Sequence, residues 1–189
     1  FNDLFVTLEK DMRAAQILIL EGETLAEISN NLDEIKAAGF NTVIIRVFQN
    51  HHDRYHRITR IQDENKYQHP SGVYFQTEMA PVVYDLISPL SYFCKRKGIK
   101  LYAWMTTRQM DWLKNEEWKD RSLDEESRAL IEGRNCDIFN PGFKNYQEII
   151  FRELATKNID GIVLQDDFVL LTREGFSPHG LDSLQQYTS

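Results

Sequence analysis

Four short apolar runs constrain the fold of this chain more than any other feature. Runs of this length, bounded by polar turns, are typical of buried strands. Because they are too uniformly apolar to be half exposed, we expect a parallel sheet covered by helices on both faces. The runs are Ala15–Leu20 (AQILIL), Asn41–Phe48 (NTVIIRVF), Lys100–Met105 (KLYAWM) and Gly161–Leu164 (GIVL).

The segments between these runs have the apolar spacing of helices. Thr24 is placed to cap the first helix, and Gly39 to end it in a left-handed conformation. The second helix is expected to stop at Gly98. The order β, α, β, α, β, α, β predicts an α/β domain. The apolar positions are Leu25, Ile28, Leu32, Ile35 and Ala38, then Val82, Leu86, Leu90 and Phe93, then Tyr146, Ile149, Ile150 and Leu154.

Two architectures fit this order, a doubly wound sheet and a parallel βα (TIM-type) barrel. We favour the barrel, because polar residues collect after the second, third and fourth strands and no glycine-rich phosphate loop follows the first. A complete barrel needs about 250 residues, and four strands cannot close one. We therefore expect residues 1–189 to be the N-terminal part of a single barrel domain, truncated to about its first four βα units.

Composition narrows the classes of function. The formal net charge of −7 argues against a surface for duplex nucleic acid, which needs concentrated positive charge. No run of about 18 apolar residues occurs, so we expect no transmembrane segment. Phe1–Glu9 lacks the basic and apolar regions of a signal peptide. Because the chain opens on Phe1, we expect a longer precursor, with the remainder of the barrel as a partner.

The most informative segment is Asp160–Leu171 (DGIVLQDDFVLL). It places Asp166 and Asp167 at the carboxyl end of a buried strand, where barrel enzymes keep catalytic groups. Neighbouring residues of a strand face opposite sides, so at most one of the two can face the barrel axis. Glycoside hydrolysis needs a proton donor and usually a second carboxylate about 5 to 9.5 Å away. We predict that the pair is catalytic, against the alternative that it caps a helix or pairs with surface cations.

Several segments resemble, in the right order, the C-terminal glycoside hydrolase domains of the PgaB poly-β-1,6-N-acetylglucosamine deacetylases. Asp160–Asp167 is similar to the strand that ends in paired aspartates in that family. The chain differs at Gln165, where the family tends to have histidine. The other matching segments are Asn31–Phe48, Val73–Leu86, Leu101–Met105 and the Asn140–Pro141 turn.

This resemblance implies a barrel domain that binds and cleaves a partly deacetylated β-1,6-linked N-acetylglucosamine polymer, a biofilm exopolysaccharide. It also implies a bacterial cell envelope location, periplasmic or extracellular, and a parent protein that is also a polysaccharide deacetylase. A weaker likeness to the chitinase strand places its Asp-Gly on Asp160–Gly161 and its terminal acid on Asp167. That comparison favours Asp167 as the proton donor.

Further residues are candidates for binding the polysaccharide. Tyr102 and Trp104 lie near a strand end, where aromatic rings can stack on sugars, although Trp104 could equally belong to the core. Trp112 lies in the loop beyond and could line a groove or simply pack, as could Trp118. Arg46 needs a carboxylate partner inside an apolar strand, and we expect Asp166 or Asp167 to supply it. Substrate-binding candidates are therefore Arg46, Tyr102, Trp104, Gln165 and Trp112.

Two other features receive simpler interpretations. The run HHDRYH at residues 51–56 includes His52 and His56 at helical spacing, but it lacks the glutamate of a zinc protease. We interpret it as a polar loop and expect neither a metal nor a cofactor. The charged stretch 116–132 is interpreted as a solvated face.

Taken together, the sequence predicts a glycoside hydrolase that acts by carboxylate acid catalysis from the end of its fourth strand. The alternative is a non-catalytic polysaccharide-binding module, in which acidic groups attract protonated glucosamine and aromatic rings stack on the sugar. Net charge alone does not separate the two.

Overall fold

Four parallel strands form the central sheet, in the positions that the apolar runs predict. The structure, a computed structural model, describes residues 11–22, 24–58 and 71–188. Phe1–Glu9 and part of the polar segment after the second run lie outside the described residues. The sheet order is β1-β3-β7-β10, with every neighbouring pair parallel. These strands are β1 (Ala14–Ile17), β3 (Thr42–Arg46), β7 (Lys100–Met105) and β10 (Gly161–Leu164).

The helices between the strands begin and end largely where local chemistry directs them. Thr24 Oγ1 accepts a hydrogen bond from Glu27 N at 3.2 Å, and Gly98 ends the second helix at φ 64°. Asn140 Oδ1 accepts from Gly142 N and Phe143 N, which caps the third helix. The helices are α1 (Leu25–Ala37), α2 (Ile87–Lys97), α3 (Pro141–Ala155) and α4 (Pro178–Thr188).

One face of the sheet carries the core. Val43, Ile45 and Leu101 are buried on it, together with apolar residues of the first three helices. The opposite face includes Tyr102 and Trp104, which are only half-buried. The prediction of helices on both faces is therefore wrong. Apolar strands do not require helices on both faces, because in a barrel the opposite strands cover the inner face.

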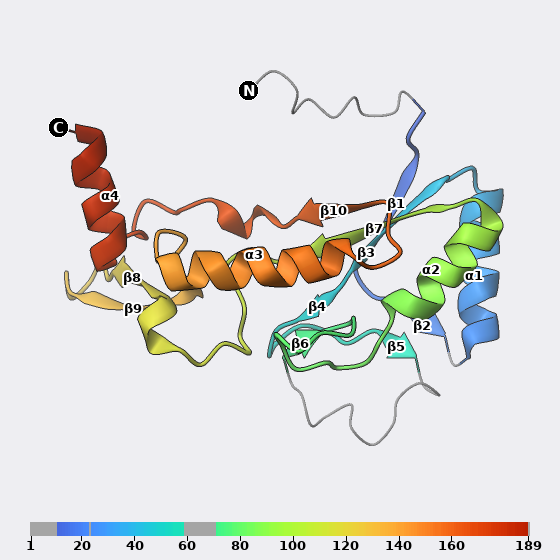
Figure 1. Cartoon of the computed structure of the whole chain (residues 1–189), viewed down its shortest axis with the longest axis horizontal. Coiled ribbons are helices and arrows are strands. Elements are labelled where there is room, and N and C mark those ends of the chain that lie inside the picture. The colour runs from blue at the N-terminus through green and yellow to red at the C-terminus, as the bar shows by residue number, and fades with distance from the viewer. Residues whose placement is uncertain (1–10, 23, 59–70, 189) are drawn as a thin grey trace.

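The strand order favours the barrel over the doubly wound sheet. A doubly wound sheet reverses its order at a switch point, whereas here each strand pairs with the next one of the α/β repeat. This order, with helices packed on one face, matches successive βα units of a barrel wall. Figure 1 shows α1 and α2 at one end of the sheet and α4 at the other.

Beyond the carboxyl ends of the strands lies a hairpin that the sequence analysis does not predict. Strands β8 (Lys119–Leu123) and β9 (Leu130–Cys136) pair antiparallel, and Figure 1 shows them near α4. Most charged side chains of the stretch 116–132 are exposed, as predicted, but Asp120 is 1% exposed. Minor pairs are formed by β2 (Glu21–Gly22) with β5 (Arg57–Ile58) and by β4 (Phe48–Gln49) with β6 (Gly72–Val73). Within the described ranges, every helix is too short or too polar to span a bilayer.

Candidate active site

The acidic pair lies on a short turn rather than on the strand itself. Strand β10 ends at Leu164, and Asp166–Phe168 forms the 3-10 helix η3. The alternation of faces expected for Asp166 and Asp167 therefore stops before it reaches them. What distinguishes the two carboxylates is their hydrogen bonding.

Asp167 is held by the loop that follows β7. Three successive backbone N–H groups, of Thr107, Arg108 and Gln109, donate to its carboxylate at 2.9, 2.8 and 2.8 Å. The hydroxyls of Thr106 and Thr107 add bonds of 2.6 and 2.7 Å. Such a row of N–H groups is an anion-binding nest. Burial by itself would raise the pKa of Asp167, but the bonds from Gln109, Thr106, Arg108 and Thr107 outweigh it and lower that pKa below its ordinary value.

Asp166 has the opposite environment. Its side chain is exposed and makes no hydrogen bond or ion pair with the part of the chain that the structure describes. Its carboxyl group is therefore free to meet a substrate. Since a proton donor must exist in its neutral form, which the Asp167 nest disfavours, the geometry argues against Asp167 and for Asp166 in that role.

Two aromatic side chains share the open face of the sheet with a polar strand end. Parallel register sets Ile44 beside Tyr102 and Arg46 beside Trp104, so all four belong to the same face. Trp104 contacts Phe48 edge to face, with ring centroids 6.1 Å apart. Tyr102 covers Gly161, where any Cβ would lie 2.5 Å from the tyrosine ring. Both rings are half-buried and keep part of their surface open.

Arg46 does not pair with the acidic pair, and that expectation is wrong. Its Nη1 lies 3.5 Å from Asp53 Oδ2, and its Nη2 donates to Gln49 Oε1 at 3.3 Å and to the carbonyl of Arg54. Arg46 is 3% exposed, and its Nε has no hydrogen-bond partner among the described residues. The loop after β3 folds back over the strand end and supplies the carboxylate locally. This burial argues against direct contact between Arg46 and a polysaccharide.

Trp112 also differs from its predicted role. It is 7% exposed and belongs to the core, where its Nε1 donates to Tyr146 Oη at 2.8 Å. A ring packed in this way cannot stack on a sugar. Trp118 likewise packs against Phe143 and Tyr146. Gln165 is half-buried and directly precedes η3, with its backbone N donating to Met105 O at 2.9 Å.

The histidine run shows no metal geometry. No group of metal-binding side chains occurs among residues 11–22, 24–58 and 71–188. His56 is fully buried: Leu20 N donates to its Nδ1 at 2.8 Å, and its Nε2 lies 2.8 Å from Arg46 O. The proton must therefore reside on Nε2, which donates to Arg46. Burial lowers the pKa of His56 to about 4, and the neutral ring joins Leu20, three residues beyond β1, to Arg46 at the end of β3.

A second carboxylate near the strand ends, that of Asp111, was not predicted from the sequence. Asp111 Oδ2 accepts from His51 N at 3.1 Å and from Arg134 Nη2 at 3.3 Å. Burial would raise the pKa of Asp111, but the bonds from His51 and Arg134 lower it. The Asp111 backbone N also donates to Asn50 Oδ1 at 3.1 Å. This cluster ties the loops after β3 and β7 to the hairpin, which local sequence does not reveal.

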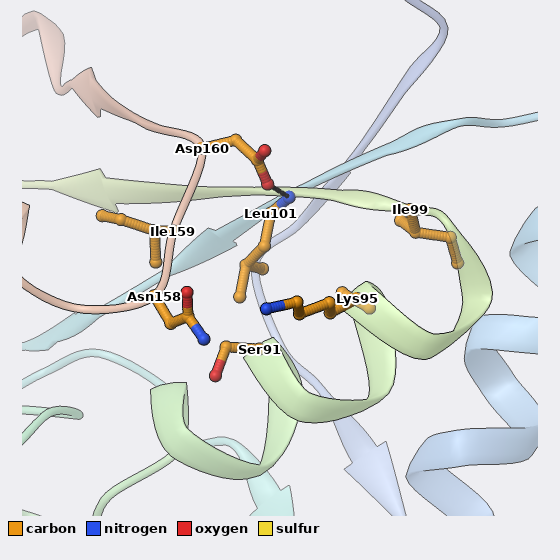
Figure 2. Close-up of a pocket in the computed structure, with 8 residues that line it drawn as sticks. Ser91, Lys95, Ile99, Leu101, Asn158, Ile159 and Asp160 are labelled. Carbon is orange, nitrogen blue, oxygen red and sulfur yellow. Dashed lines mark hydrogen bonds between the residues drawn. The ribbon is translucent and has the colours of Figure 1, made fainter.

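At the amino end of the sheet, Asp160 has a structural role. Its Oδ2 accepts from Leu101 N at 2.8 Å, and its own N donates to Leu101 O at 2.7 Å. Figure 2 shows this contact at the edge of a cavity of about 210 Å³, toward which Ser91, Lys95 and Asn158 also extend. Asp160 thus fixes the register of β10 against β7, at the end of the sheet opposite the acidic pair.

Comparison with known proteins supports the fold. No protein-family model matches the chain, and no curated protein matches its sequence. Among solved structures, it is similar to the PgaB (BpsB) glycoside hydrolase domain of Bordetella bronchiseptica, with a TM-score of 0.68 and 20% identity. The match covers 94% of this chain and 50% of that one, so the chain spans about half the length of that domain.

Two further similar structures are also carbohydrate enzymes by name. One is α-L-fucosidase isoenzyme 2 of Paenibacillus thiaminolyticus, with a TM-score of 0.58 and 12% identity over 93% of this chain and 26% of that one. The other is the maltogenic α-amylase AmyB of Thermotoga neapolitana, with a TM-score of 0.52 and 14% identity over 96% of this chain and 44% of that one. At these identities the likeness establishes the fold alone. The chain therefore has a glycoside hydrolase-like α/β fold built on one parallel four-stranded sheet.

Proposed function

We propose that this chain is part of a glycoside hydrolase that binds and cleaves a partly deacetylated β-1,6-linked N-acetylglucosamine polymer. The observation that carries the proposal is the unequal pair after β10: three backbone N–H groups bind the carboxylate of Asp167, whereas the side chain of Asp166 is exposed. A glycosidase needs a carboxyl group that can give its proton to the leaving oxygen. The likeness to the PgaB domain supports the choice of polymer.

The two aspartates take different roles in this proposal. Asp166 donates the proton to the glycosidic oxygen. Asp167 remains ionised, orders the loop after β7, and adds a fixed negative charge beside the positive charge that develops on the sugar. The nucleophile or general base on the opposite side of the sugar from Asp166 comes from the substrate or from another part of the cleft.

The open face of the sheet supplies the surroundings of the reacting sugar. Tyr102 and Trp104 offer aromatic surface, and Gln165 lies beside the turn that carries Asp166. An acidic cleft edge attracts the ammonium groups of glucosamine units, which are absent from a fully acetylated polymer. The negative charge of Asp167 therefore favours a partly deacetylated chain.

The remaining barrel strands are the expected partner of this wall. In the described sheet, β1 and β10 are edge strands. Apolar side chains are exposed beside the β10 edge, including Leu164 at 54%, Phe168 at 53% and Val169 at 55%. Unpaired edges and apolar patches of this kind are covered in native proteins. We place the complete domain in the bacterial envelope, where such a polymer is found.

One observation favours a non-catalytic binding module as the second candidate. Glycoside hydrolysis usually takes two carboxylates, and the hydrogen bonds of Asp167 commit one of this pair to the loop after β7. A module that only binds would keep the anionic edge and the aromatic rings without any proton transfer.

Single replacements separate the two candidates. In the full-length protein, Asp166→Asn should abolish the release of new reducing ends from partly deacetylated polymer while retention of that polymer on the protein persists. Glu148→Gln, an exposed carboxylate on α3, is the matched control and should behave as the wild type. Undiminished cleavage by the Asp166→Asn protein would rule out the catalytic assignment, and retention without cleavage in the wild type would favour the binding module.

A further inference from the structure

Arg108 is a fully buried charged residue next to the proposed site. It has 0% exposure and is the largest such side chain among the described residues. A guanidinium is costly to bury unless carboxylates and carbonyls satisfy it. Its contacts therefore identify which segments it joins.

The guanidinium of Arg108 joins the hairpin to the segment after η3. Its Nη2 lies 2.9 Å from Asp120 Oδ2 on β8, and its Nε donates to Cys136 O on β9 at 3.1 Å. Its Nη1 lies 2.8 Å from Glu174 Oε2 and donates to Val169 O at 3.3 Å. The side chains of Asp120 and Glu174 are 2% and 12% exposed, so solvent screens these pairs little.

The backbone of the same residue touches the acidic pair directly. Arg108 N donates to Asp167 Oδ2 at 2.8 Å, and Arg108 O accepts from Cys136 N at 3.0 Å. The turn η3 is thus held at Asp167 by the Arg108 backbone and at Val169 by the Arg108 side chain. Glu174 reinforces the second hold, because its carboxylate also accepts from Leu171 N at 3.1 Å.

We propose that Arg108 is a positioning residue that fixes η3, and with it the carboxyl group of Asp166, against the loop after β7. The role rests on the proposed function and extends it: the hairpin is a brace for the acidic pair. The one-turn helix η3 does not by itself fix the direction of the Asp166 carboxyl group. The hydrogen bonds of Arg108 to Asp167 and Val169 therefore determine where the Asp166 proton can be delivered. Misplacement of a catalytic group by about 1 Å costs on the order of 100-fold in rate.

The test uses Arg108→Lys, which keeps the charge but cannot reach both carboxylates as a planar fork. We expect kcat on the partly deacetylated polymer to fall about 10- to 100-fold, with KM changing less than about twofold. The carboxyl ¹³C titration of Asp167, followed by NMR, should show its pKa rising toward the ordinary value of about 3.9. Arg121→Gln, an exposed arginine on the same hairpin, should change neither quantity.

The NMR titration does not depend on activity, so it tests the brace even if the wild type cleaves nothing and the proposed function fails. If Arg108→Lys does not fold, Glu174→Gln replaces it, because this change weakens the contact of Arg108 with Glu174 and leaves its other contacts in place. It should shift kcat and the Asp167 pKa in the same directions, but by less. An unchanged Asp167 pKa and an unchanged kcat in a folded variant would overturn the positioning role. So would a fall in activity that merely matches the fraction of unfolded protein.

Discussion

The two ends of the parallel sheet use aspartate in different ways. At the amino end, Asp160 accepts one hydrogen bond, from Leu101 N, and fixes strand register (Figure 2). At the carboxyl end, Asp167 is bound by five donor groups of Thr106–Gln109, while its neighbour Asp166 has no partner in the described chain. The difference teaches that carboxyl content alone does not mark a site. What singles out the carboxyl end is an exposed carboxyl group beside a fully hydrogen-bonded one, and the proposed function rests on that contrast.

The largest structural effect should come from Asp167. Asp167→Asn leaves several N–H and O–H donors of the Thr106–Gln109 loop without an acceptor, which should lower the free energy of unfolding by about 2–4 kcal/mol. Asp166→Asn should change it by less than about 0.5 kcal/mol. Urea unfolding of the two variants checks this. Equal destabilisation by both would erase the proposed distinction between them.

A second effect at the carboxyl end depends on pH through His56. Its folded pKa of about 4 lies below the unfolded value of 6.5, so protonation opposes folding. Its contribution is present in full above about pH 6.5 and is lost as the pH falls toward 4, by on the order of 3 kcal/mol. The free energy of unfolding, measured at several pH values between 6.5 and 4, should therefore fall as the pH falls.

His56→Gln serves as the control for that slope. It removes the titrating ring, and the pH dependence between 6.5 and 4 should flatten even though the variant is less stable at neutral pH. A slope that survives the replacement would mean that other groups, such as Asp111, control the acid sensitivity.

The smallest effect is expected at the amino end. Asp160→Ala removes one hydrogen bond to Leu101 N and should cost about 1 kcal/mol, without changing polymer cleavage beyond the loss of folded protein. Thermal unfolding and reducing-end assays on the same samples test this. A selective loss of cleavage would show that the two ends are coupled more closely than their contacts indicate.

Local sequence predicted the sheet and most helix ends well. Strand positions follow from apolar runs, and Thr24 and Gly98 act through chemistry within a few residues. Asn140 was predicted only as part of a turn with Pro141, and in the structure it also caps α3. The start of α2 was missed, because Val82 forms a bridge with Val73 and the helix begins only at Ile87. The apolar spacing after Val82 does not reveal this pairing, so the sequence alone predicts a helix that begins too early.

The catalytic role of the acidic pair stays a prediction. The sequence places the pair after β10, but the different environments of Asp166 and Asp167 depend on contacts about 60 residues apart in the chain. The burial of Arg108 and Asp120 was invisible for the same reason, since a charged stretch without apolar alternation is normally solvated. Trp112 was misassigned because an isolated tryptophan in a loop carries no signal that separates packing from exposure.

The leaving-group dependence of cleavage tests the central claim most directly. The dinitrophenolate of a dinitrophenyl glucosaminide leaves without being protonated, whereas the sugar that leaves during polymer cleavage needs a proton on its glycosidic oxygen. We predict that the Asp166→Asn protein cleaves the aryl glycoside at close to the wild-type rate while its polymer cleavage is lost, and that Asp167→Asn impairs both. Equal loss of both activities in the Asp166→Asn protein, or polymer cleavage at the wild-type rate, would contradict the assignment of Asp166 as the proton donor.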